Sequence, residues 1–148
     1  MRLQDEVSMV ESRSCFVAIP ASQTSLREAI RDALRASGMQ MLGDGDFSGT
    51  SLPVKAIQRA DLMIADITGL GPYVFYALGV ADALYKPVLV IGQRPVNFLG
   101  DFAGHKLITY GPEEFEKLSG FVQYWVLDTL EPSVSRPYPA VYRPTISL

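Results

Sequence analysis

The sequence predicts a single α/β domain of three layers, with a five-stranded parallel sheet of the flavodoxin-like or Rossmann-like type between two layers of helices. Two observations predict this class. Short apolar runs alternate with longer helix-like segments along the 148 residues, and glycine, proline or a polar cluster separates neighbouring runs. Strands joined through helices pair in parallel with a right-handed crossover, so we expect the strand order 2-1-3-4-5.

Each element follows from a local signal. The central strand is a short apolar run that ends at a glycine-rich turn, and Pro72 suits the first turn of the helix that follows. Ser25 and Glu28 have the spacing of a capping box, and the acids around Glu114 suit a helix N-terminus. We expect strands at residues 15–19, 39–42, 62–67, 88–91 and 106–109, and helices at 25–37, 52–60, 72–85 and 111–130.

The chain divides into three parts. Residues 1–13 show no clear period and form a lead-in, 14–130 form the α/β domain, and 131–148 form a tail rich in proline. Because proline interrupts helices, we expect the tail to run extended. It either docks on a second subunit or on a different protein, or it lies free.

Composition excludes several classes of partner. A net charge of −3 and a pI near 5.1 argue against a nucleic-acid partner, which would need a basic stripe. No apolar run reaches the ~18 residues of a membrane span, so we expect no membrane partner. The single cysteine, Cys15, excludes an internal disulfide and suits the cytoplasm, and its apolar run predicts burial. His105 has no metal-spaced neighbours, so we expect no metal and no cofactor.

The carboxyl edge of the predicted sheet is where a ligand is expected, because open α/β sheets bind ligands there and helix N-termini favour anionic groups. Asp66 either holds ribose hydroxyls or hydrogen-bonds local N–H groups. The loop 43–51 either cradles a phosphate or is a plain mobile loop, and the tyrosines either stack on a base or pack in the core or an interface. The candidate ligand-binding residues are Pro20, Ser22, Asp44, Asp46, Asp66, Thr68, Gly69, Gly71, Tyr73 and Tyr76.

Four runs of the sequence together resemble the nucleoside 2-deoxyribosyltransferase-like family, a distant relative of the TIR-type domains that cleave NAD. They are FVAIP at 16–20, ADLMIADITG at 60–69, PYVFYALGVA at 72–81 and KPV at 86–88. The resemblance implies N-glycosidic chemistry, in which a glutamate of an "ELG" element attacks the sugar and another acid protonates the departing base. It also implies oligomers whose sites a neighbouring subunit often completes.

This chain departs from the family at the residue that matters most. Ala77 stands where the resemblance implies the glutamate, although it remains a candidate ligand-binding position, and the helix 52–60 contains no acid. Asp82 lies five residues on, about 140° round the helix, and faces elsewhere. We therefore expect a nucleoside- or nucleotide-binding or assembly protein without the transferase chemistry. The alternative is an active N-glycosidase or deoxyribosyltransferase on a nucleoside, nucleotide or NAD, with an acid from Asp44, Asp46, Asp66 or a partner chain.

A second subunit is expected on the helix 72–85. From residue 74 onward its only charged side chain is Asp82. A helix that is apolar all round is buried all round, so one face covers the sheet and the other packs on another chain. The sequence thus predicts a homo-oligomer through this helix. A weaker reading makes the protein an adaptor with an empty pocket.

Overall fold

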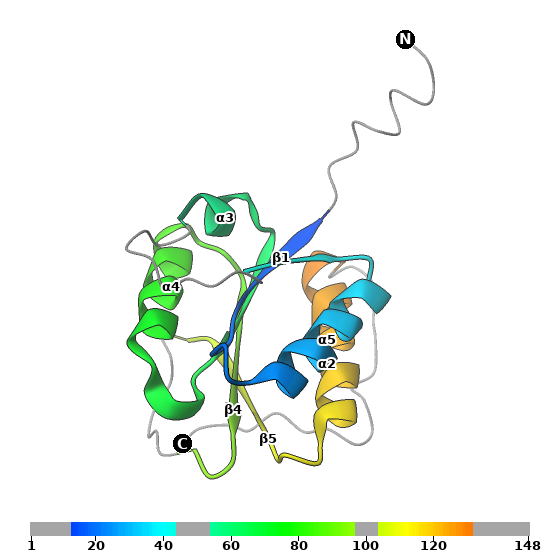
Figure 1. The fold of residues 1–148 in the computed structure, drawn as a ribbon. Coiled ribbons are helices and arrows are strands. Elements are labelled where there is room, and N and C mark those ends of the chain that lie inside the picture. The colour runs from blue at the N-terminus through cyan, green and yellow to red at the C-terminus, as the bar shows by residue number, and fades with distance from the viewer. Residues whose placement is uncertain (1–12, 44–53, 97–103, 132–148) are drawn as a thin grey trace.

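The computed structural model describes residues 13–43, 54–96 and 104–131, and it forms a sheet between two layers of helices (Figure 1). Helices α2 and α5 cover one face, and α3 and α4 cover the other. The elements are β1 (Ser14–Ala18), α2 (Thr24–Ala36), β2 (Gln40–Leu42), α3 (Val54–Arg59), β3 (Leu62–Asp66), the 3₁₀ turn η1 (Thr68–Leu70), α4 (Pro72–Ala83), β4 (Val88–Gln93), β5 (Lys106–Tyr110) and α5 (Phe115–Leu130).

The predicted topology is confirmed. The five strands follow the order β2-β1-β3-β4-β5, and every neighbouring pair is parallel. Val17 of β1 lies opposite Ile64 of β3, and Asp66 at the end of β3 lies opposite Ile91 of β4. The order in which strands are added to the sheet reverses between β1 and β3, so a crevice at their carboxyl ends is the expected ligand site of such a sheet.

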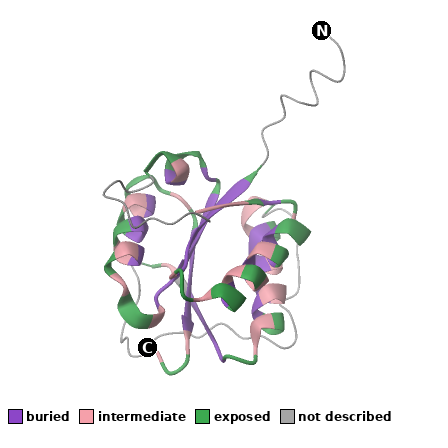
Figure 2. Ribbon diagram, viewed as in Figure 1, coloured by how far each residue is buried: buried purple, intermediate pink, exposed green. Residues whose placement is uncertain are grey.

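The strands at the centre of the molecule consist largely of buried residues (Figure 2). Every residue of β1 and β3 is buried, as expected for strands covered on both faces. One apolar cluster packs α2 and α5 on the sheet around Ile64 and Trp125, and the other packs α3 and α4 around Phe16 and Ala77. Each fully buried large aliphatic side chain contributes about 1.5–3 kcal/mol, so these clusters supply most of the folding free energy.

Two predicted helix starts are wrong. Helix α2 begins at Thr24 after Gln23, with no side-chain cap, so Ser25 is not the capping residue. Helix α5 begins at Phe115, four residues after the expected start at Gly111. There Glu114 closes a turn instead, since its N–H donates to the Gly111 carbonyl and its carboxylate accepts from the Gly111 N–H.

Several expectations fall on residues outside the description. They concern the lead-in before Arg13, most of the loop 43–51, the cap of the helix 52–60 and the tail after Glu131. Within the described part, no helix is long and apolar enough to cross a membrane.

Candidate functional site

Asp66 is the last residue of the central strand β3, so it lies at the carboxyl edge of the sheet, where a ligand is expected. Its side chain is wholly buried. Oδ1 accepts hydrogen bonds from the Thr68 N–H at 3.0 Å and the Thr68 hydroxyl at 2.6 Å, and Oδ2 accepts from the Tyr110 hydroxyl at 3.5 Å. The Gln93 N–H in turn donates to Thr68 Oγ1 at 2.8 Å. The carboxylate therefore ties β3 to β4 and β5.

The surroundings of Asp66 shape its acidity. Burial raises the pKa of its carboxyl group above the usual range, while the hydrogen bonds from Thr68 and Tyr110 oppose that rise. Burial, together with the nearby Asp66, also raises the pKa of Tyr110. Local donors occupy the carboxylate, so this geometry favours the simpler of the two roles considered for Asp66, that of a hydrogen-bonded turn residue.

A cavity of about 180 Å³ lies beside this network, between η1 and the end of β4. Thr68 and Gln93 supply its polar atoms, and Leu70, Pro95 and Val96 supply apolar walls. Gly92 forms part of the wall, because a Cβ there would lie 3.3 Å from the side chains of Ile67 and Val96. Sites for drug-sized ligands occupy about 300–1,000 Å³. The cavity is thus large enough for a ring or a sugar, but not for a whole nucleotide.

The turn that leads into α4 has an unusual backbone conformation. Gly69 has φ 80° and Leu70 has φ 53°, a left-handed conformation that a leucine seldom adopts. Leu70 is also 47% exposed at the cavity wall. The turn delivers the chain to Gly71, which precedes Pro72 at the first position of α4. The N-terminus of α4 therefore opens on the carboxyl edge of the sheet.

A second polar cluster lies beside the reversal point between β1 and β3. The Arg27 guanidinium, from α2, donates to the Gly43 carbonyl at 2.8 Å. Burial raises the pKa of the Tyr73 hydroxyl to about 12, although the positive charge of Arg27 lowers it. Gly43 has φ 90°, and a Cβ there would lie 2.7 Å from the Val17 carbonyl oxygen, so only glycine fits. Arg27 thus ties α2 to the residue after β2, and its positive charge acts on Tyr73 at the start of α4.

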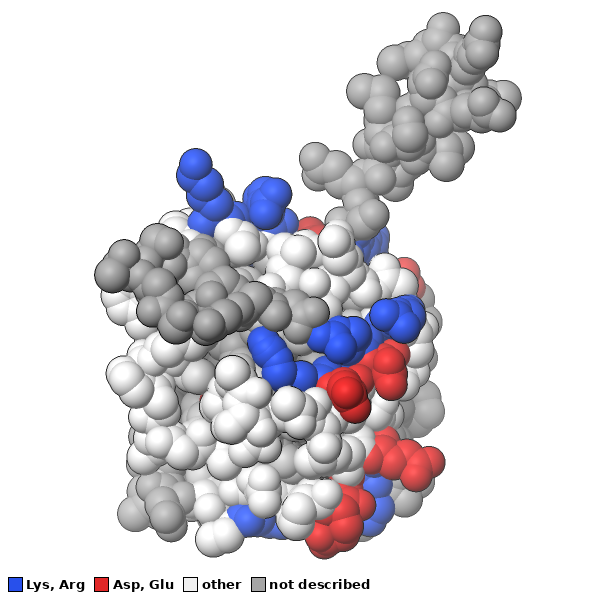
Figure 3. Space-filling model, in the orientation of Figure 1, with Lys and Arg blue, Asp and Glu red and all other residues white. Residues whose placement is uncertain are grey.

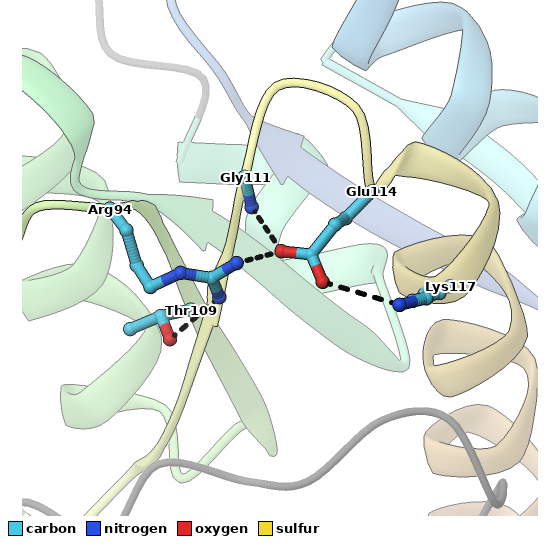
Figure 4. Close-up of polar contacts among 5 residues, drawn as sticks. All are labelled: Arg94, Thr109, Gly111, Glu114 and Lys117. Atoms are coloured by element: carbon cyan, nitrogen blue, oxygen red, sulfur yellow. Dashed lines mark hydrogen bonds and ion pairs between the residues drawn. The ribbon is translucent and has the colours of Figure 1, made fainter.

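A third polar cluster closes the edge at β4 and β5 (Figure 4). Glu114 forms an ion pair with Arg94 and lies 3.7 Å from the Lys117 amino group. The Gly111 N–H also donates to Glu114 Oε1 at 2.8 Å, and Arg94 reaches the Thr109 hydroxyl at 3.4 Å. The Glu114 carboxylate therefore stabilises the turn before α5 through these contacts.

The structure places the remaining predicted site residues as follows. Pro20 and Ser22 lie in the loop after β1, where the Pro20 carbonyl accepts from the Gln23 N–H and Ser22 is exposed. Tyr76 is 60% exposed on α4. Asp44 and Asp46 lie outside the described residues. The edge therefore brings Pro20, Ser22, Asp66, Thr68, Gly69, Gly71 and Tyr73 to one side of the sheet.

Ala77 is wholly buried and belongs to the apolar cluster between α4 and the sheet. It is not among the residues that line the cavity beside Thr68. The described part of the preceding helix, α3, reads Val-Lys-Ala-Ile-Gln-Arg and contains no acid. Among the described residues, no group of three or more His, Cys, Asp or Glu side chains is placed to hold a metal ion.

Sequence reasoning missed three residues of this edge, namely Arg27, Gln93 and Tyr110. Arg27 looks like an ordinary surface residue of an amphipathic helix, and its contact with Gly43 spans 16 positions. Gln93 and Tyr110 end two strands that run further than expected. One signal could have found Gln93 and Tyr110: each follows an apolar strand run, and the carboxyl ends of parallel strands meet at one edge of the sheet.

Comparison with known proteins identifies solved structures of the same fold. The CMP N-glycosidase of Clostridium botulinum aligns with a TM-score of 0.55 and 22% identity, over 72% of this chain and 98% of that chain. The 2-deoxyribosyltransferase of Bacillus psychrosaccharolyticus aligns with a TM-score of 0.50 and 15% identity, over 73% and 91%. No family model and no curated protein sequence matches the chain. At these identities the likeness shows the fold.

Proposed function

We propose that this protein binds a nucleoside- or nucleotide-type ligand at the carboxyl edge of its sheet, in the cytoplasm, and lacks the transferase chemistry that the sequence resemblance implies. One observation supports the loss of chemistry: Ala77, which stands where the sequence resemblance implies the family's glutamate, is wholly buried among apolar side chains. A methyl group cannot form a covalent bond to the sugar.

The described carboxylates at the same edge support the loss of chemistry. Both oxygens of Asp66 accept hydrogen bonds from within the chain, and Glu114 is paired with Arg94. A carboxylate that attacks an anomeric carbon must approach it closely, whereas the Asp66 side chain is wholly buried. Asp66 and Glu114 instead serve as acceptors that hold strand ends and turns.

Ligand binding is supported by two features of the edge. The cavity beside Thr68 offers apolar walls and the Gln93 side chain, which suits one ring of a nucleoside. Arg27 supplies a positive charge, and the N-terminus of α4 supplies the positive end of a helix dipole, for an anionic group. The two structural neighbours are named for reactions of CMP and of deoxyribosyl groups. We also propose a homo-oligomer through α4, and a protein partner for the tail 131–148.

An active enzyme is the second candidate, and the raised pKa of Asp66 favours it. An acid that holds its proton closer to neutral pH suits the protonation of a departing base. In that case the substrate would be a nucleoside, a nucleotide or NAD, and the attacking group would come from water, from Asp44 or Asp46, or from a partner chain.

Thermal unfolding with and without ligand tests the proposal. The probes are CMP, the other nucleoside monophosphates, nucleosides and NAD, with inorganic phosphate as a control. A ligand that binds only the folded chain at ~100 times its Kd adds about 2.7 kcal/mol to the free energy of unfolding. We expect at least one probe to raise the Tm and to remain chemically intact by chromatography. Mass spectrometry of small molecules released from the purified protein should identify the same class.

A matched pair of variants localises the binding. Arg27→Gln removes the guanidinium at the edge, whereas Arg35→Gln removes an exposed guanidinium two turns further along α2. We expect the ligand-dependent rise in Tm to fall in the first variant and to stay in the second. The proposal fails if no probe raises the Tm. It also fails if the protein converts the probes chemically. If Asp66→Asn then abolishes this conversion, the second candidate function, an active enzyme, is supported.

A further inference from the structure

A second cavity, of about 230 Å³, lies between α2 and the amino end of β2. Gln40 is the first residue of β2, so this cavity opens at the amino edge of the sheet, whereas Asp66 ends β3 at the carboxyl edge. We call the cavity the α2–β2 pocket. Two basic, one amide and two thioether side chains belong to its lining residues, which are Arg31, Arg35, Met39, Gln40 and Met41.

Two arginines from successive turns of α2 give the pocket its charge. Arg31 and Arg35 are four residues apart, so they share one ridge of the helix, with Cβ atoms about 5–6 Å apart. Figure 3 shows basic side chains gathered over α2, with acidic ones beside them. The acids of α2, Glu28 and Asp32, each follow an arginine by one residue, which turns them about 100° away from this ridge. Neither acid is among the residues that line the pocket, so the pocket is locally cationic.

The repulsion between these two arginines gives the isolated fold no advantage. Like charges at four-residue spacing destabilise a helix, and a bound anion would relieve that repulsion. Arg31 is half-buried beside the pocket, and Arg35 is exposed near the end of α2. Both guanidinium groups lie where an anion in the pocket would meet them.

The β2 side of the pocket adds an apolar wall. Met39 is 5% exposed and Met41 is half-buried, and thioether side chains adapt readily to the shape of a small apolar group. The exposed Gln40 side chain offers both a donor and an acceptor. The pocket therefore combines two cations with a wall that suits methylene groups.

The size and the chemistry of the pocket together indicate its ligand. Sites for drug-sized ligands occupy about 300–1,000 Å³, so 230 Å³ suits a smaller molecule. A guanidinium group binds a carboxylate through two parallel hydrogen bonds. Two such groups from successive helical turns match two carboxylates that are a few carbon atoms apart. A phosphate monoester carries both charges on one group, so it would leave the apolar wall unused.

We propose that the α2–β2 pocket binds a small dicarboxylate. One carboxylate pairs with Arg31 and the other with Arg35, and the methylene chain between them lies against Met39 and Met41. The ligand enters at the amino edge of the sheet, so this site is separate from the nucleoside or nucleotide site at the carboxyl edge.

Isothermal titration calorimetry of the full chain at physiological ionic strength tests the site. The probes are succinate, glutarate and adipate, with butyrate as the monocarboxylate and glycerol 3-phosphate as the phosphate monoester. We expect at least one dicarboxylate to bind once per chain, and butyrate to bind at least tenfold more weakly, because it leaves one guanidinium without a partner. No dicarboxylate binding at millimolar concentrations overturns the proposal, as does tighter binding of glycerol 3-phosphate than of every dicarboxylate.

A matched pair of variants places the binding in the pocket. Arg35→Gln and Arg59→Gln each remove one exposed arginine from the last turn of a helix, but only Arg35 lines the pocket. We expect dicarboxylate binding to weaken at least tenfold in Arg35→Gln and to stay unchanged in Arg59→Gln. Equal weakening in both variants would indicate general charge attraction and would overturn the proposal. Binding of nucleotides is expected to persist in Arg35→Gln, so the two sites are tested separately.

Discussion

Replacing Asp66 tests whether its carboxylate serves the fold or a ligand. Asp66→Ala removes the acceptor for the Thr68 N–H, the Thr68 hydroxyl and the more distant Tyr110 hydroxyl, all inside the protein. Asp66→Asn keeps an oxygen for the two Thr68 donors and can turn its NH₂ group toward the Tyr110 oxygen. Asp66→Asn therefore keeps the shape of the side chain and most of its hydrogen bonds, whereas Asp66→Ala loses both.

The expected magnitudes follow from these contacts. A buried donor that loses its acceptor costs about 1–3 kcal/mol. Two donors at 2.6 and 3.0 Å lose theirs in Asp66→Ala, so we expect the free energy of unfolding at pH 7 to fall by roughly 3–4 kcal/mol. Asp66→Asn also removes a buried charge, so we expect a change within about 1 kcal/mol at pH 7, in either direction.

The pH dependence has a definite sign. Because burial raises the pKa of Asp66 in the folded state, the folded chain binds more protons than the unfolded chain between the two pKa values. The contribution of Asp66 to stability is therefore largest below the pKa of the unfolded chain, and it declines as pH rises through the pKa of the folded chain. Asp66→Asn should remove this decline.

Urea unfolding, followed by tryptophan fluorescence between pH 4 and pH 8, measures all three quantities. The structural account of Asp66 requires Asp66→Ala to be much less stable than Asp66→Asn. It is wrong if both variants unfold like the wild type while neither binds ligand, since that outcome would assign the carboxylate to the ligand.

Three further predictions concern single side chains. Gly43→Ala should lower the free energy of unfolding by about 2 kcal/mol or more in urea titrations, because its Cβ would lie 2.7 Å from the Val17 carbonyl oxygen at φ 90°; wild-type stability would contradict that contact. Cys15 is fully buried and burial raises its pKa, so iodoacetamide should label it only after unfolding, and rapid labelling of the native chain would refute its burial. Ala77→Glu should lower the Tm by several degrees, because it inserts a carboxylate into an apolar cluster. A stable Ala77→Glu protein would show instead that position 77 opens on a polar cleft.

The strand order was predictable from sequence because it depends on strong local signals. Pro72 and the glycines before it fix the start of α4, and Lys86-Pro87 fixes its end, so the central unit was identified nearly to the residue. The sequence order of elements then leaves few topologies open to a parallel sheet. The prediction succeeded at these boundaries of the central unit, but it failed at Gly111-Pro112, because α5 begins only at Phe115.

The starts of α2 and α5 were less predictable. Ser25 and Glu28 have capping-box spacing, but the helix begins one residue earlier, after the turn in which the Gln23 N–H bonds the Pro20 carbonyl. Glu114 suits a first helical turn by charge, yet its contact with Arg94 draws it into a turn before α5. In both cases a nearby backbone or side-chain contact outweighed a weak local preference.

The candidate site was only partly predictable for a different reason. The edge itself follows from topology, and Asp66 and Thr68 lie there in contact with each other. Thr68 engages one oxygen of the Asp66 carboxylate locally, but the contact of the other oxygen with Tyr110 spans 44 positions. The role of Arg27 likewise depends on Gly43. Such long-range pairs leave no periodic signal in one sequence.

Chromatography of each nucleoside, nucleotide and NAD after prolonged incubation with the wild-type protein, at a concentration that also raises its Tm, tests the central claim most directly. The account predicts that the ligand that stabilises the protein is recovered whole, with neither free base nor exchanged sugar. Release of free base by the wild type, and its loss in a variant that still folds and binds, would contradict the claim.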